Sequence, residues 1–84
     1  HMKVTVYGSH LCPDTLYAIN QLMSKGVDTS FKNISAALSD LKEFLAIREN
    51  DAIFDNAKKN GGLGIPFFVL EDGTRTLDIT KVIG

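Results

Sequence analysis

Residues 3–26 read KVTVYGSHLCPDTLYAINQLMSKG, and this stretch decides the fold class. Residues 3–7 alternate and are rich in β-branched side chains, which is typical of a strand. After a short polar turn, apolar residues recur at helical spacing, so the sequence predicts a helix that begins at Pro13 and ends at Lys25-Gly26. Its predicted apolar face consists of Leu16, Ile19, Leu22 and Met23. A strand that runs directly into a helix indicates an α/β protein.

Two further helices are predicted in the middle of the chain. Residues 27–34 favour a second, weaker strand. Either Ser35 or Ser39 is suited to cap a second helix that ends near Asn50, and Asp51 is suited to cap a short third helix that ends at Asn60. The buried side of the second helix is expected to hold Leu38, Leu41, Phe44, Leu45 and Ile47.

The last third of the chain predicts a hairpin. Residues 66–70 form the continuous apolar run of a central buried strand, Asp72-Gly73 is typical of a hairpin turn, and residues 74–77 would return. Asp78 could then cap a short final helix. The first strand–helix–strand unit implies parallel pairing, whereas the hairpin implies antiparallel pairing. We therefore predict one α/β domain over residues 1–84 with a four-stranded mixed sheet, in the order strand–helix–strand–helix–helix–strand–strand–helix.

Composition excludes several classes of function. The chain has 84 residues, a net charge of −1 and a hydrophobic fraction of 44%, without the basic stripe that binding of nucleic acid requires. No apolar run approaches the ~20 residues that span a bilayer, so we expect no membrane partner. We also expect a monomer. The single cysteine excludes an internal disulfide and favours a reducing compartment, most simply the cytoplasm. One cysteine and two histidines are too few for a structural zinc site, and His1-Met2 is typical of an expression tag.

Cys12 is the candidate reactive centre. It follows the first strand and begins the first helix, where unpaired N–H groups and a partial positive charge stabilise a thiolate. The end of a parallel strand is also where open α/β sheets bind ligands. A buried structural cysteine is the alternative, and position alone leaves both open.

Gly64-Ile65-Pro66 is the second candidate feature. A proline that opens a buried strand donates no ladder hydrogen bond, and a cis Ile65–Pro66 bond would explain its presence there. Ile65 would then offer free backbone groups beside Cys12 to an extended peptide. The alternative is a trans proline that merely begins the strand.

The segment Tyr7-Gly-Ser-His-Leu-Cys12-Pro13-Asp14-Thr15, together with Gly64-Ile65-Pro66-Phe67-Phe68-Val69 and Asp72-Gly73, resembles the glutaredoxins. The resemblance covers nearly the whole chain and is greatest to bacterial glutaredoxin-related proteins. It implies a thioredoxin fold, a nucleophilic Cys12, a cis Pro66 and thiol–disulfide exchange with glutathione as co-substrate.

Departures from the family pattern imply a monothiol mechanism. Thr15 stands where dithiol members have a second cysteine, so a second thiol must resolve the mixed disulfide. The Thr15 hydroxyl could donate a hydrogen bond to the thiolate. Ser9 replaces the usual lysine, and the glycine pair and acidic residues that hold glutathione are missing after the last strand.

The candidate site residues fall into two groups. Those expected to take part in catalysis are Cys12, Pro13 and Thr15. Those expected to contact substrate are Tyr7, Arg48, Ile65, Pro66, Asp78 and Thr80. Alternatives stay open for three residues: Tyr7 could pack in the core, Arg48 could be a solvated helix end rather than a carboxylate ligand, and His10 could be an exposed loop residue rather than a proton-transfer group.

The leading hypothesis is a glutaredoxin-like monothiol oxidoreductase that reduces glutathionyl mixed disulfides of proteins, with glutathione or another small thiol as reductant. Binding of an iron–sulfur cluster through Cys12 and glutathione is a second hypothesis. A thioredoxin-fold interaction module with weak or no redox activity is a third.

Overall fold

The computed structural model describes residues 2–84, and His1 lies outside them. The elements, in chain order, are β1 (Lys3–Gly8), α1 (Pro13–Ser24), β2 (Asp28–Asn33), α2 (Leu38–Asn50), the 3₁₀ helix η1 (Ala52–Phe54), α3 (Asp55–Lys59), β3 (Phe67–Leu70), β4 (Arg75–Thr76) and α4 (Thr80–Ile83). Among these elements no helix is both long and apolar enough to cross a membrane.

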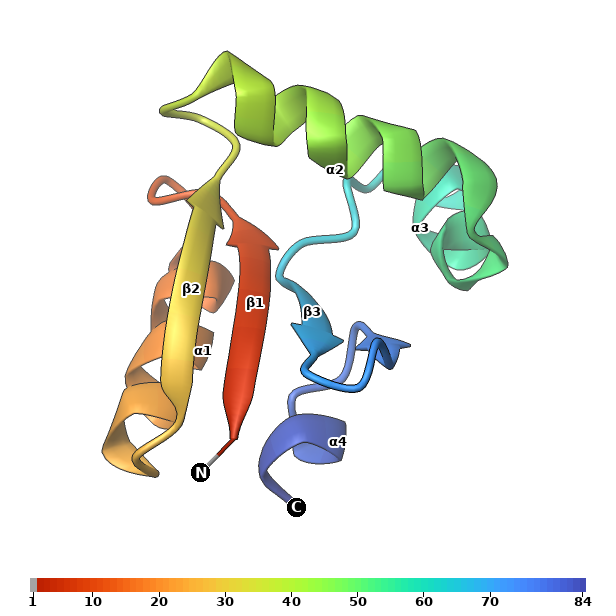
Figure 1. The fold of residues 1–84 in the computed structure, drawn as a ribbon. Helices are drawn as coiled ribbons and strands as arrows, with labels where there is room; N and C mark the ends of the chain where they lie inside the picture. Colours follow the sequence, from red (N-terminus) through yellow and green to blue (C-terminus); the bar gives the residue numbers. More distant parts are fainter. Residues whose placement is uncertain (1) are drawn as a thin grey trace.

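The four strands form one mixed sheet in the order β2-β1-β3-β4. β1 pairs in parallel with β2, whereas β1 with β3 and β3 with β4 are antiparallel. Helices flank both faces of this sheet, with α1 and α4 on one side and α2 on the other (Figure 1). The predicted four-stranded mixed sheet with flanking helices is therefore confirmed.

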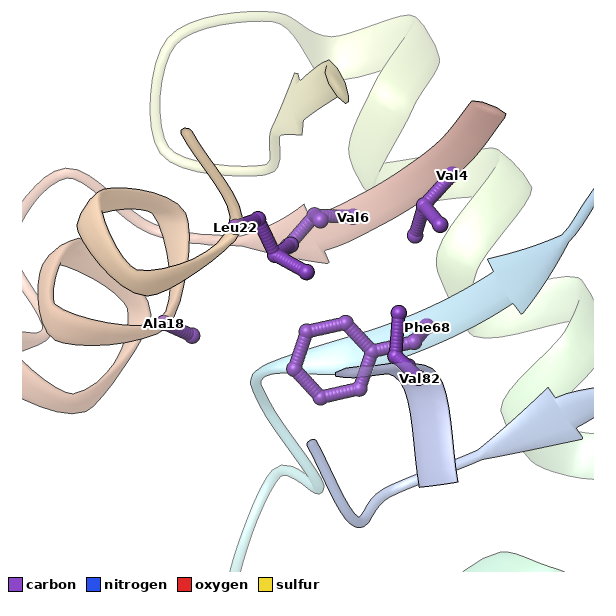
Figure 2. Packing of buried hydrophobic residues seen from close by; sticks show 6 residues of the cluster. All are labelled: Val4, Val6, Ala18, Leu22, Phe68 and Val82. Carbon is purple, nitrogen blue, oxygen red and sulfur yellow. The ribbon is translucent and has the colours of Figure 1, made fainter. Parts of the chain in front are cut away.

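β1 supplies side chains to two separate core clusters, because successive residues of a strand point to opposite faces. Val4 and Val6 face α1 and α4, where Phe68 of β3 joins them (Figure 2). Tyr7 faces α2 and packs with Phe67 of β3. The central strand is thus buried on both faces.

Aromatic rings dominate the cluster beneath α2. Phe44, Phe54 and Phe67 are fully buried, and the rings of Phe54 and Phe67 meet edge to face with centroids 4.8 Å apart. Edge-to-face pairs at such distances contribute about 0.5–1.5 kcal/mol beyond the burial of their area. These contacts hold α2 and η1 against the sheet.

The buried face of α1 differs from the predicted one. Thr15, Ala18 and Leu22 are buried, whereas Leu16 is 44% exposed and Met23 64% exposed. Positions 15, 18 and 22 also have helical spacing, and the small side chains of Thr15 and Ala18 let α1 approach β1 closely. The prediction assigned the most hydrophobic residues to the buried face of α1. The predicted face is therefore displaced by about one residue from the observed one.

Two predictions for α2 are also wrong. Leu38 is 65% exposed rather than buried, whereas Leu41, Phe44, Leu45 and Ile47 pack in the aromatic cluster as predicted. Neither serine caps the helix: its N-cap is Ala37, which forms no side-chain capping bond. The Ser35 hydroxyl pairs instead with that of Ser9, and Ser39 lies inside the helix.

Other turn predictions are confirmed. The Asp51 side chain accepts a hydrogen bond from Ile53 N–H at 3.1 Å, and this bond together with the Arg75 guanidinium holds the Asp51 pKa below its usual value. Gly73 closes the β3–β4 turn with φ of +91°. β4 spans only Arg75–Thr76, shorter than the predicted return strand.

β1 and α1 approach each other most closely at Gly8. A Cβ atom on Gly8 would lie 2.6 Å from Thr15 Oγ1 and closer still to Thr15 Cγ2. Thr15 is fully buried. Only a glycine therefore fits the end of β1 while Thr15 occupies this position.

We expect Gly8→Ala to lower the free energy of unfolding by about 1–3 kcal/mol, because it overpacks this contact. Chemical denaturation of the purified variant measures the loss. The double variant Gly8→Ala/Thr15→Ala removes the clashing atoms, so the cost of Gly8→Ala should be smaller in that background. If Gly8→Ala lowered the free energy of unfolding equally in the wild type and in Thr15→Ala, the contact between positions 8 and 15 would not be the cause.

Burial and the carboxylate of Glu43 raise the pKa of Tyr7 to about 12. Desolvation contributes most, and the hydrogen bond to Glu43 further favours the neutral phenol. An unfolded chain ionises this tyrosine near pH 10, so the folded state keeps a proton that the unfolded state has lost. The contribution of the Tyr7 proton to the free energy of unfolding is therefore fully present below pH 10 and is lost as the pH rises towards 12.

We expect the free energy of unfolding to fall more steeply in the wild type than in Tyr7→Phe between pH 10 and pH 12. The difference should reach about 2–3 kcal/mol, at ~1.36 kcal/mol per pKa unit. Urea unfolding across this range provides the measurement. Tyr17→Phe, which alters an exposed tyrosine, is the control. Parallel curves for wild type and Tyr7→Phe would refute the prediction.

Candidate functional site

A cavity of about 470 Å³ opens at one end of the sheet, beside Cys12. Three connections meet there: β1–α1, β2–α2 and α3–β3 (Figure 1). Its lining residues are Ser9, Leu11, Cys12, Ile34, Ser35, Gly62, Leu63, Gly64 and Ile65. The carboxyl ends of the parallel strands β1 and β2 lie at this edge, which is the usual position for ligands in α/β sheets.

Cys12 occupies the N-cap position of α1, with extended backbone dihedrals and partial exposure to solvent. Its N–H donates to Ser9 O at 3.0 Å and its carbonyl accepts from Leu16 N–H at 3.2 Å, so the backbone is held at both sides. The side chain forms no capping hydrogen bond, and Pro13 follows at the first helical position. Cys12 therefore lies at the positive end of a helix dipole and belongs to the cavity lining.

Ile65 lies in the cavity lining with Cys12, and the Ile65–Pro66 peptide bond is cis, as predicted. Among residues 2–84, neither the N–H nor the carbonyl of Ile65 has a backbone hydrogen-bond partner. Backbone groups of this kind can pair with an extended segment of a ligand. Cys12 and Ile65 are thus brought together from positions that are far apart in the sequence.

Two serines join the first two connections of the cavity. The hydroxyl of Ser9 is hydrogen-bonded to that of Ser35, and it also accepts from Leu11 N–H at 3.0 Å. The prediction treated Ser9 as a departure from the family and Ser35 as a cap, so it missed this contact. Their short polar side chains beside two strand ends were the available signal, but the pairing depends on the parallel register of β1 and β2.

Asn33 makes a second link between the same connections. Its side-chain amide donates to His10 Nδ1 at 2.9 Å, while its Oδ1 accepts from His10 N–H at 3.4 Å and from Ser35 N–H at 3.1 Å. The imidazole is therefore hydrogen-bonded to Asn33, and His10 is not a cavity-lining residue. This arrangement favours a loop-bracing role for His10 over proton transfer.

Thr15 lies beneath the cavity rather than in its wall. Its Oγ1 accepts from Ser9 N–H at 3.4 Å, and the residue is fully buried. Thr15 thus supports the loop that carries Cys12. A hydrogen bond from its hydroxyl to the thiolate stays a prediction.

Arg48, near the end of α2, contacts the third connection of the cavity. Nε donates to Leu63 O at 2.8 Å and Nη2 donates to Gly62 O at 2.7 Å. Two of its nitrogen atoms are therefore occupied by the chain's own carbonyls. None of the nine residues that line the cavity is acidic or basic, apart from any thiolate formed at Cys12.

Four other predicted contact residues are not part of the cavity lining: Tyr7, Pro66, Asp78 and Thr80. Tyr7 packs in the aromatic cluster beneath α2, in accordance with the core alternative. The Asp78 carboxylate accepts from Thr80 N–H at 3.0 Å and from the Thr80 hydroxyl at 2.7 Å, and these bonds lower the pKa of Asp78. Asp78 and Thr80 thus form a local turn at the start of α4.

Metal ligands are not clustered in the part of the chain that the structure describes. Nowhere in residues 2–84 do three side chains of His, Cys, Asp or Glu come together to form a metal site.

Comparison with known proteins identifies one relative. No family model matches the chain, and no solved structure matches it. An uncharacterized protein of Haemophilus influenzae is 39% identical over 80 residues, which is 95% of this chain and 93% of the relative. Identity at this level over nearly the full length of both chains shows common descent, and the chain therefore belongs to the same family as this Haemophilus influenzae protein.

Proposed function

We propose that the protein is a thioredoxin-fold, glutaredoxin-like monothiol oxidoreductase that reduces mixed disulfides through Cys12. The observation that carries the proposal is the position of Cys12 and Ile65 in the lining of one cavity, with the cis Ile65–Pro66 bond beside them. The order of the strands and helices is compatible with a thioredoxin-like fold.

The geometry around Cys12 supports a nucleophilic role. Cys12 is partly exposed, lies at the start of α1 and belongs to the cavity lining, and these properties are typical of reactive rather than structural cysteines. The free N–H and carbonyl of Ile65 could align a peptide that carries the target disulfide. Cys12 would then attack a sulfur atom held across the cavity.

The proposed reaction has two exchange steps. The Cys12 thiolate attacks one sulfur of the mixed disulfide, a new S–S bond forms, and the other sulfur leaves as a thiolate that takes a proton from solvent. A second thiol, such as glutathione, then attacks the mixed disulfide on Cys12 and releases the Cys12 thiolate. The substrate disulfide is reduced to a thiol, and the small thiol is oxidised to a disulfide.

The uncharged cavity favours a second candidate function. Glutathione carries two carboxylates, and no basic side chain lines the cavity beside Cys12. Leu11 and Leu63 are both exposed and both belong to its lining, which suits an apolar ligand. The second candidate is therefore an interaction module of the same fold with weak or no redox activity.

Replacing Cys12 separates the two candidates. We expect Cys12→Ser to reduce the exchange rate with a glutathionylated peptide to the uncatalysed background, because a serine hydroxyl is not ionised near neutral pH. Thiol release from the peptide, followed with glutathione in excess, measures the rate. Oxidised glutathione should also give one mixed-disulfide adduct on the wild type by intact mass and none on the variant.

A matched control tests whether the loss is specific to Cys12. Ser24→Ala alters an exposed hydroxyl at the end of α1, opposite to the end that carries Cys12, and should keep the wild-type rate. Circular dichroism should show the same fold for all three proteins. Wild-type protein that neither forms the adduct nor exceeds the background would refute the oxidoreductase and favour the interaction module.

A further inference from the structure

Arg48 joins the C-terminal end of α2 to the segment that forms one wall of the cavity. Its guanidinium contacts two successive carbonyls, Gly62 O through Nη2 at 2.7 Å and Leu63 O through Nε at 2.8 Å. The remaining nitrogen, Nη1, lies 4.0 Å from Glu49 Oε1. The Arg48 side chain is only 17% exposed, although the carbonyls that it contacts lie at the surface.

The contacted segment forms few other hydrogen bonds, although Ile65 also packs against the aromatic cluster. Gly62 N–H donates to Ala57 O at 2.7 Å, but no backbone–backbone hydrogen bond within residues 2–84 involves Leu63, Gly64 or Ile65. Gly61 and Gly64 both have positive φ, at +74° and +90°, and glycine permits many other conformations there. Arg48 therefore supplies the polar contacts that fix this stretch relative to α2.

An arginine is suited to this task for geometric reasons. The planar guanidinium offers donors in a rigid fork, so it can bond two neighbouring carbonyls at once, whereas a lysine ammonium acts as a point charge. A cation is also favoured near the C-terminal end of a helix such as α2.

We propose that Arg48 is a positioning residue for the site around Cys12. Arg48 holds Gly62 and Leu63 in place, so that the cavity stays open and Ile65 faces the incoming disulfide. This inference rests on the proposed oxidoreductase function. Arg48 acts through the α3–β3 connection and does not itself contact the substrate, because Nε and Nη2 are bonded to the chain. Cys12 lies on the β1–α1 connection, so its chemistry does not depend on Arg48.

The kinetic test compares Arg48→Ala and Arg48→Lys with Arg75→Ala, which removes the chain's other arginine and an exposed ion pair with Asp51. We expect Arg48→Ala to raise KM for a glutathionylated peptide about tenfold, a factor equivalent to ~1.4 kcal/mol, with little change in kcat. Arg48→Lys should have a KM between those of the wild type and Arg48→Ala. Millimolar guanidinium should lower KM for Arg48→Ala alone, leaving wild type and Arg75→Ala unchanged.

A second measurement does not depend on activity. In ¹⁵N-labelled protein, Arg48→Ala should shift or broaden the amide signals of residues 62–65, and guanidinium should return them towards their wild-type positions. Signals from β1 should stay unchanged. Should Arg48→Ala fail to fold, Arg48→Lys provides both readouts, with smaller effects of the same kind.

The outcomes distinguish the two proposals. Wild-type protein without exchange activity would refute the oxidoreductase, and the amide signals alone would then decide whether Arg48 holds the cavity wall. Amide signals unaltered in both Arg48 variants would overturn the positioning role. An active enzyme whose KM is the same in wild type and Arg48→Ala would overturn it as well, even if the signals moved.

Discussion

The burial of β1 on both faces is the constraint on which the rest of the structure depends. Val4 and Val6 point towards α1 and α4, while Tyr7 points towards the aromatic cluster under α2. Because one strand supplies both layers of the core, helices must cover both faces of the sheet. β1 also pairs with β2 on one side and β3 on the other, so its carboxyl end becomes the meeting point of three connections.

The cavity is a consequence of this arrangement. β1 ends at Gly8, where α1 approaches so closely that Thr15 occupies the space of a side chain. The chain then turns through Ser9 into Cys12, which lies at the N-terminus of α1 and is partly exposed to solvent. Side-chain hydrogen bonds hold the surrounding connections: Ser9 to Ser35 on one side, and Arg48 to Gly62 and Leu63 on the other. Cys12 therefore lies in a cavity formed by short connections, which these side-chain hydrogen bonds hold in place.

Much of the fold could be predicted from local pattern, whereas the direction of individual side chains could not. Alternation in β1, the apolar run of β3 and the Asp72-Gly73 turn predicted the mixed sheet, whereas the cis bond at Pro66 was expected from the resemblance to the glutaredoxins. The buried faces of α1 and α2 were partly wrong, because hydrophobicity identifies an amphipathic helix more reliably than its rotation about its own axis. Leu16 and Leu38 are exposed, while the smaller Thr15 is buried.

The sequence by itself determined the elements, their order, and the placement of a single cysteine at the start of a helix. These depend on the spacing of apolar residues, on glycine and proline, and on neighbours in the chain. The position of Ile65 beside Cys12 was expected from the sequence, whereas the other surroundings of Cys12 depend on the tertiary structure. The tertiary structure added Leu63 to the cavity lining, left Tyr7, Asp78 and Thr80 outside it, and directed Arg48 to the backbone of the α3–β3 connection. The physical reason is that such contacts depend on how strands pair and helices rotate over a shared core, which no local stretch of sequence specifies.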